Sequence, residues 1–179
     1  KALLKQMGAD PEKRIVLFLS RISSGKGLDL LAEAWQRVVA YRKGWQLLIV
    51  GPDDRGYTDK IRRLFDRLVT DGSVVFHAPL YGWDKCRLLK SVDAFVMPSR
   101  SENFNISVQE ALAAGLPTIC TKGAPWEEIA AYEAGAWVDI SVDGIEFGLK
   151  LILGADDELR RKMSNAGKSL IATNYQWAS

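Results

Sequence analysis

The stretch AFVMPSRSENFNISVQEALAAGLPTICT, residues 94–121, contains the pattern that decides the fold. It begins with an apolar run at 94–98 and ends with another at 117–121, and the segment between them has helical character. Gly115 and Pro117 mark the end of that helix, because glycine is common just past a helix C-terminus and proline cannot continue it. The order strand, polar loop, helix, strand is typical of a parallel sheet.

The same alternation continues along the chain. Six apolar runs are predicted to be strands: IVLFLS (15–20), QLLIVG (46–51), VVFH (74–77), AFVMP (94–98), PTICT (117–121) and a short AWV near 137. They are apolar at nearly every position, as expected when helices cover both faces of a parallel sheet. The sequence therefore predicts a doubly wound, mostly parallel six-stranded α/β sheet, Rossmann-like, in a single domain comprising residues 1–179.

Helical segments fill the gaps between the strands. The expected apolar faces are Leu28, Leu31, Ala32, Trp35, Val38 and Val39 in one segment, and Ile61, Leu64, Phe65 and Leu68 in the next. The part from Gly144 to Thr173 is predicted to form two charged amphipathic helices with a break near Gly154.

Composition limits the classes of function. The 179 residues carry a net charge of only +2, so general attraction to nucleic acid or an anionic membrane is not implied. Cys86 and Cys120 have no CxxC spacing and the chain has one histidine, which argues against a disulfide framework and a zinc site. We expect both cysteines to be reduced, buried thiols. The apolar runs are too short to span a bilayer, and we expect a cytoplasmic protein.

Ligands of such a sheet bind at the carboxyl ends of its strands, where the following loops meet. These loops are SRISSGKG (20–27), GPDDRGY (51–57), HAPLYGW (77–83), SRSENFN (99–105) and TKGAPWEE (121–128). None contains GxxxxGK[ST], and GKGLDL lacks the final glycine of GxGxxG, so neither a P-loop nor a dinucleotide fingerprint is predicted.

Arg21 and Lys26 flank the amino end of the first long helix, where cations are unfavourable unless an anion lies between them. Bound phosphate is one explanation. The other is that Arg21 pairs with a neighbouring acid while Lys26 points into water. The residues themselves leave both interpretations open.

Glu102 and Glu110 raise a similar choice. If Ser107 is the N-cap, Glu110 completes an S-x-x-E capping box and needs no ligand. If Asn103 or Asn105 is the N-cap, free amides face the loop edge and Glu110 lies farther along the helix. Local patterns do not choose between these geometries.

Three stretches together resemble the carboxyl-terminal half of a family 4 (group 1) retaining glycosyltransferase of the GT-B fold. They are RIVLFLSRISSGKGLDLLAEAW (14–35), LLIVGPDDRGY (47–57) and the segment from FHAPLYG to PWEEI (76–129). The E-x7-E spacing from Glu102 to Glu110, followed by EALAAGLP, carries most weight when joined to R-x4-KG and VGPDDRGY. In that family this half binds a nucleotide-diphosphate sugar, and a separate amino-terminal domain holds the acceptor.

The resemblance implies a role for each matching residue. Arg21 and Lys26 would bind the diphosphate and offset its growing charge. Glu110 would accept hydrogen bonds from the ribose hydroxyls, and Glu102 would contact the sugar near the reacting carbon. The implied catalytic residues are Glu102, Arg21 and Lys26. Further donor contacts would come from the main chain of Asn103, Phe104, Asn105 and Ile106, with Pro79 and Leu80 holding the base.

The chain departs from the family pattern in one loop. Many members have E-G-F-G where this chain has E-N-F-N, so Asn103 and Asn105 must adopt the backbone that glycine allows there. Asparagine tolerates positive φ better than most residues, so we expect the loop to persist with an altered sugar preference. His77, Trp126 and Trp137 are interpreted as packing or surface residues.

We expect no cofactor and no metal, since no DxD motif ends a strand and the acidic pair in GPDDRGY is typical of a turn. Between its KALLKQMGADPEKR start and its NYQWAS end, the chain has no acceptor domain and no closing helix, so we expect an excised domain that is inactive alone. The full-length enzyme would act in polysaccharide biosynthesis on a carbohydrate or lipid-linked acceptor. We expect it to bind no nucleic acid and to be peripheral at the inner membrane face.

Two alternatives belong to other classes. A nucleotide-sugar epimerase-like GT-B domain would release free sugar. A non-catalytic flavodoxin-like module would need an acid at the carboxyl end of a strand, whereas these strands end in Ser20, Gly51, His77, Pro98 and Thr121.

Overall fold

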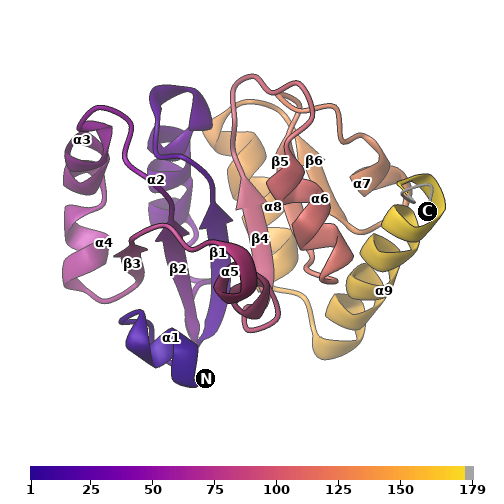
Figure 1. The fold of residues 1–179 in the computed structure, drawn as a ribbon, viewed down its shortest axis with the longest axis horizontal. Coiled ribbons are helices and arrows are strands. Elements are labelled where there is room, and N and C mark those ends of the chain that lie inside the picture. Colours follow the sequence, from indigo (N-terminus) through magenta and orange to yellow (C-terminus); the bar gives the residue numbers. More distant parts are fainter. Residues whose placement is uncertain (176–179) are drawn as a thin grey trace.

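The computed structural model describes residues 1–175 and contains one sheet of six strands (Figure 1). The strands are β1 (Arg14–Leu19), β2 (Trp45–Val50), β3 (Val74–His77), β4 (Ala94–Met97), β5 (Thr118–Thr121) and β6 (Gly135–Val138). All neighbours are parallel, in the order β3-β2-β1-β4-β5-β6. The predicted fold class is confirmed, and this order differs from the 2-1-3-4-5 order of flavodoxin-like folds, which rules out that alternative.

The helices are distributed over both faces of the sheet. They are α1 (Ala2–Gln6), the 3₁₀ turn η1 (Ser24–Lys26), α2 (Leu28–Arg37), α3 (Tyr57–Leu64), α4 (Asp66–Thr70), α5 (Gly82–Leu89), α6 (Ile106–Ala113), α7 (Glu128–Ala131), α8 (Val142–Leu153) and α9 (Asp157–Asn174). The chain runs outward from β1 in one direction and from β4 in the other. Because parallel crossovers are right-handed, the helices that connect β1 to β3 and those that connect β4 to β6 lie on opposite faces, and α8, which follows β6, returns to the face of α2.

Helix packing follows from that reversal. α2 packs against α8 on one face, and α6 packs against α9 on the other. In Figure 1, α5 and α6 lie in front of the sheet and α8 lies behind it. The predicted pair of helices near the end of the chain is confirmed, with the break at Gly154. The expectation that the chain ends at NYQWAS, residues 174–179, without a closing helix falls largely on residues 176–179, which lie outside the described residues. Between residues 1 and 175, no helix combines the length and apolar character needed to cross a membrane.

Two residues assigned to apolar helix faces are exposed instead. Val39 is 61% exposed because α2 ends at Arg37, so the helical register no longer applies to it. Leu64 is 44% exposed because the single helix expected there is broken, with Phe65 separating α3 from α4. The other residues assigned to these two faces are buried: Leu28, Leu31, Ala32, Trp35, Val38, Ile61, Phe65 and Leu68.

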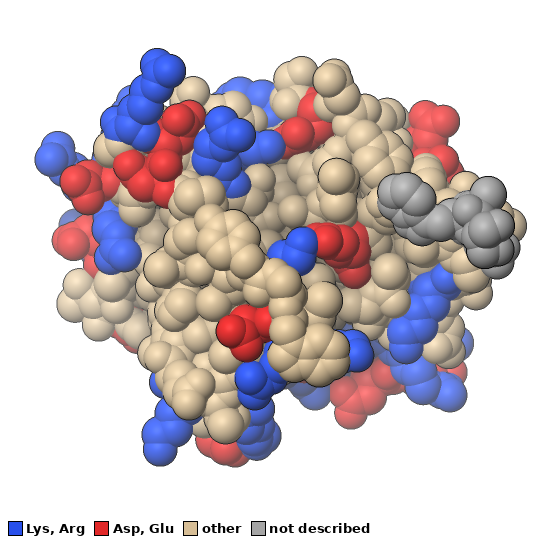
Figure 2. All heavy atoms as spheres, viewed as in Figure 1, with Lys and Arg blue, Asp and Glu red and all other residues tan. Residues whose placement is uncertain are grey.

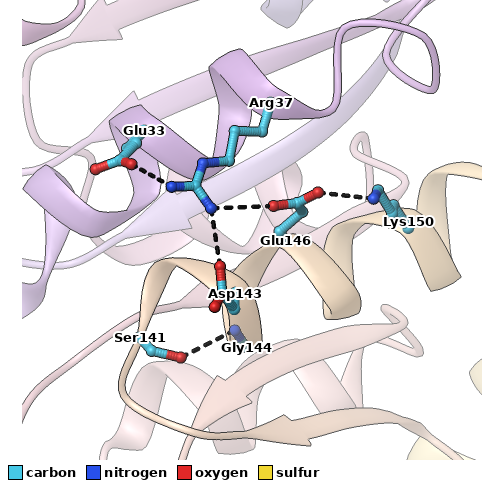
Figure 3. Close-up of polar contacts among 7 residues, drawn as sticks. All are labelled: Glu33, Arg37, Ser141, Asp143, Gly144, Glu146 and Lys150. Atoms are coloured by element: carbon cyan, nitrogen blue, oxygen red, sulfur yellow. Dashed lines mark hydrogen bonds and ion pairs between the residues drawn. The ribbon is translucent and has the colours of Figure 1, made fainter.

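An ion-pair network joins α2 to α8 (Figure 3). Arg37 donates to Glu33 at 2.5 Å on its own helix, and to Asp143 at 2.8 Å and Glu146 at 3.5 Å on α8. Glu146 also pairs with Lys150 at 2.7 Å, and these hydrogen bonds lower the pKa of Glu146. The network is largely solvent-exposed, so it guides how α2 lies on α8 more than it stabilises the fold.

The carboxyl ends of β1 and β2 meet without room for an additional atom. A Cβ at Gly51 would lie 1.8 Å from the carbonyl oxygen of Ser20. We therefore expect Gly51→Ala to lower the free energy of unfolding by at least about 2 kcal/mol, because backbone must move. Urea denaturation measures this. Gly25→Ala is the matched control, since nothing lies within 4 Å of its added Cβ. Equal stability of the two variants would contradict the close approach.

Candidate functional site

Two adjoining hollows open at the carboxyl edge of the sheet. The first, of about 580 Å³, is lined by residues of the loop after β1, including Arg21 and Lys26, and by Pro52 and Ser107. The second, of about 430 Å³, is lined by Lys26 and by residues 102–107 of the loop after β4 and the start of α6. They share Ser20, Lys26 and Ser107, so the loops after β1 and β4 border one continuous depression.

A third hollow, of about 380 Å³, lies on the β2 and β3 side of the same edge. Gly51, His77 and Pro79 are among its lining residues. Leu80 is partly buried and packs against the core. Figure 2 shows basic and acidic side chains interspersed over the face in view, without a large area of one sign. The described part of this face therefore has no broad area of positive charge that would attract an anion.

Lys26 and Glu102 form an ion pair at the boundary of the first two hollows. The Lys26 ammonium donates to Glu102 Oε1, and the Ser99 hydroxyl donates to the same oxygen at 2.7 Å. The two charged side chains are only 20% and 14% exposed. The interpretation in which Lys26 points into water is therefore wrong.

Arg21 has the opposite character. It is exposed, lines the first hollow, and makes no ion pair with any residue in 1–175. The interpretation in which Arg21 pairs with a neighbouring acid is also wrong. The depression thus presents one guanidinium with no ion-pair partner among residues 1–175 and one ammonium shared with a carboxylate.

Two close contacts lock the loop after β1 onto the loop after β4. Arg100 donates two hydrogen bonds to the Asp29 carboxylate, at 2.8 and 2.6 Å, and its backbone N–H donates to the Gly25 carbonyl at 2.9 Å. Gly27 has φ +68°, and a Cβ there would lie 1.9 Å from the carbonyl oxygen of Pro98. Sequence reasoning missed Arg100 and Asp29, which are 71 positions apart and meet only because β4 lies beside β1.

Asn105 is the N-cap of α6. Its side-chain oxygen accepts from the backbone N–H of Val108 at 3.3 Å, and its φ is +70°. The capping box led by Ser107 is therefore wrong, and the geometry with Asn105 as the cap is confirmed. Positive φ is present at Asn105 but not at Asn103, so only one of the two asparagines adopts a backbone that favours glycine.

Aromatic side chains pack against the loop after β4, which contains Phe104. Trp126 is fully buried, and its indole N–H donates to the carbonyl oxygen of Phe104. The Phe104 ring contacts Trp126 and Tyr175, with centroids 5.0 and 5.7 Å apart. Trp137 is partly buried and donates to a backbone carbonyl at 3.0 Å. The interpretation of both tryptophans as packing residues is confirmed.

Glu110 lies just beyond the first turn of α6, outside the lining of the first two hollows. Its Oε1 accepts from the Lys85 ammonium of α5 at 2.5 Å. Of the four groups singled out from the sequence, Arg21, Lys26 and Glu102 therefore share one depression, and Glu110 lies beside it with a partner. Nothing in the sequence pattern pointed to Lys85.

Cys120 lies in β5. Burial, together with the charge of Glu102, raises the pKa of its thiol to about 12. Cys86 is exposed, so the expectation that both thiols are buried is wrong for Cys86. In the described residues, 1–175, no three His, Cys, Asp or Glu side chains are placed to hold a metal ion.

Comparison with known proteins identifies similar sequences. Residues 1–170 match the family model for Glycosyl transferases group 1. An uncharacterized glycosyltransferase of Methanocaldococcus jannaschii is 30% identical over 97% of this chain and 44% of its own. The GDP-mannose-dependent monoacylated alpha-(1-6)-phosphatidylinositol monomannoside mannosyltransferase of Corynebacterium glutamicum is 31% identical over 98% of this chain and 47% of its own. The chain spans less than half the length of these curated relatives.

Solved structures share the fold. The C-terminal domain of LpcC, a group 1 family glycosyl transferase from Francisella tularensis, has a TM-score of 0.82 at 22% identity, covering 98% of this chain and 92% of that one. Anabaena HepE, solved in complex with UDP, has a TM-score of 0.81 at 18% identity, covering 98% of this chain and 48% of that one. The predicted likeness to the carboxyl-terminal half of a GT-B fold is confirmed.

The two cysteines should differ sharply in reactivity. At pH 8 the Cys120 thiol, with its pKa of about 12, is almost entirely protonated and shielded, whereas Cys86 is exposed. We expect a disulfide reagent to titrate one thiol in the native protein and two after denaturation. Cys86→Ser should remove the fast reaction and Cys120→Ser should keep it. Two fast thiols in the native protein would contradict the burial of Cys120.

The Arg100–Asp29 contact should make stability depend on pH. Hydrogen bonds from Arg100 lower the pKa of Asp29 below its ordinary value of 3.8. The stabilisation is therefore complete above pH 3.8 and is lost as the pH falls through the lower, folded-state pKa. Because the pair is partly exposed, we expect Asp29→Asn to cost about 0.5–1 kcal/mol near pH 7. Urea denaturation at several pH values measures the difference.

That difference should stay constant between pH 5 and 8 and shrink in acid. Asp54→Asn is the matched control, since Asp54 makes no side-chain hydrogen bond or ion pair with residues 1–175 and its replacement should change little. A cost that grows as the pH falls would have the wrong sign for this contact.

Proposed function

The chain belongs to the group 1 glycosyl transferases, and from that starting point we propose that it is the donor-binding domain of a retaining glycosyltransferase. The enzyme would transfer a hexose from a nucleotide-diphosphate sugar to a carbohydrate or lipid-linked acceptor. The observation that carries the proposal is the continuous depression bordered by Arg21, Lys26 and Glu102. The GDP-mannose dependence named for the Corynebacterium relative and the UDP complex of HepE support a nucleotide donor.

The diphosphate fits the first hollow on charge grounds. Arg21 has no ion-pair partner among the described residues, so an anion there would gain a charge-assisted hydrogen bond at no cost to another contact. Lys26 lies between both hollows and could donate to a phosphate oxygen while remaining near Glu102. Charge that grows on the departing diphosphate would be offset by these two cations without a metal ion.

The sugar fits the second hollow. Glu102 is held by Ser99 and Lys26, so its carboxylate is fixed where sugar hydroxyls would donate to it. The backbone from Asn103 to Ile106 lines the same space, and the amino end of α6 offers free N–H groups. Glu102, Arg21 and Lys26 would be the catalytic residues of the transfer.

The nucleoside would extend from the diphosphate toward the third hollow. The base would be held by main-chain contacts near Pro79 and Leu80, and the ribose would contact Glu110. The acceptor would be held by another part of the enzyme. Transfer requires the donor and the acceptor to be held next to each other. We propose that the 179 residues alone bind donor nucleotide weakly and transfer nothing, and that the whole enzyme acts at the inner membrane face in polysaccharide biosynthesis.

Arg21→Ala is the cleanest test of the diphosphate site. We expect it to weaken binding of the preferred nucleoside diphosphate about 10- to 100-fold, the range for losing one hydrogen bond to a charged group. The melting temperature should be nearly unchanged, since Arg21 makes no ion pair within residues 1–175. Titration calorimetry with UDP, GDP and ADP identifies the preferred ligand and measures the loss.

Two comparisons make the result specific. Arg67→Ala removes an exposed α4 arginine that likewise makes no ion pair in the described part of the chain, and it should bind as the unaltered protein does. Lys26→Ala should weaken binding and also lower the melting temperature, because it leaves Glu102 partly buried without its partner. Binding of none of the three nucleotides, or full binding by Arg21→Ala, would refute the proposed site.

A further inference from the structure

Lys85 bridges two helices that begin at different parts of the site. It lies on α5, which follows the loop containing Pro79, and it pairs with Glu110 on α6, which follows the loop containing Glu102. The Lys85 ammonium and Glu110 Oε1 are 2.5 Å apart, and the side chains are 29% and 31% exposed. The pair therefore links the helix after the loop proposed to hold the base to the helix after the loop proposed to hold the sugar.

We propose that Lys85 is a positioning residue for the ribose of the donor: it fixes Glu110 so that one carboxylate oxygen is occupied and the other is left for the ribose hydroxyls. This inference rests on the proposed function and extends it. Glu110 accepts no second hydrogen bond within residues 1–175, so its Oε2 has no partner there, and the side chain is 31% exposed. Lys85 itself need not touch the nucleotide.

Two physical effects favour such an arrangement. A glutamate side chain has large rotamer freedom, which costs up to about 2 kcal/mol to lose when a ligand binds. The ion pair orders Glu110 before binding, so a ligand gains its hydrogen bonds without that cost. The ammonium also neutralises a carboxylate that lies beside a site for an anion, which would otherwise repel it.

A merely structural tie between α5 and α6 predicts a different outcome. In that case the loss of Lys85 would lower stability and weaken every nucleotide alike. Positioning of Glu110 instead predicts a loss that depends on the ribose hydroxyls. Nucleotides with and without those hydroxyls therefore distinguish the two explanations.

The test uses titration calorimetry with the tightest binder among UDP, GDP and ADP and with its 2′,3′-dideoxy analogue. We expect Lys85→Met to weaken the ribonucleotide about tenfold and the dideoxy analogue less than about threefold. Lys85→Arg should restore ribonucleotide binding to within about threefold, because guanidinium also pairs with carboxylate. Glu110→Gln should reproduce the selective loss, and the double variant should lose little more than either single variant.

Lys162→Met is the matched control. Lys162 pairs with Glu158 on α9 at 3.0 Å, so this variant removes one paired ammonium away from the site and should bind both nucleotides normally. Equal losses for both nucleotides in Lys85→Met, or no loss, would overturn the inference even where Glu110→Gln shows the selective loss. If the unaltered protein binds none of the nucleotides, the proposed function fails and the inference fails with it.

Discussion

The position of β4 directly beside β1 is the constraint on which the site depends. The sheet order reverses there, so the chain after β1 turns to one face and the chain after β4 turns to the other. A crevice necessarily remains where the two loops separate. The bond from Arg100 to Asp29 and the close approach of Gly27 to Pro98 hold its two walls in fixed positions. The depression is thus a product of topology, made rigid by a few contacts across it.

The crevice combines a paired ammonium and carboxylate with a separate guanidinium. A partly buried ammonium or carboxylate is costly alone, and Lys26 and Glu102 offset each other's desolvation. Glu110 on α6 and Lys85 on α5 form a second such pair. Arg21 remains unpaired among the described residues, which leaves a net attraction for an anion at one end and fixed acceptors for hydroxyls at the other. The proposed donor, a sugar joined to a diphosphate, has the same succession of groups.

Much of the fold could be predicted because buried parallel strands are apolar at nearly every position, a local property. The ends of α2 at Arg37 and of α3 at Leu64 could not be predicted. The apolar periodicity continues past both positions, to Val39 and to Phe65, so it does not show where each helix ends. In the site, the sequence showed charged residues in the loops after two strands, at Arg21, Lys26 and Glu102. Their partners were not: Arg100 with Asp29 and Lys85 with Glu110 are distant in sequence.

The E-N-F-N loop shows how the missing glycines are compensated. Asn105 takes a positive φ that glycine would adopt freely, and such a backbone costs about 1–3 kcal/mol for other residues. Three contacts hold it there: the cap to Val108, the Trp126 bond to the Phe104 carbonyl, and the packing of Phe104 against Tyr175. Asparagine also adds side-chain donors and acceptors that a glycine loop lacks, and both asparagines line the second hollow. The loop therefore combines the positive φ of Asn105 with a polar surface toward the second hollow.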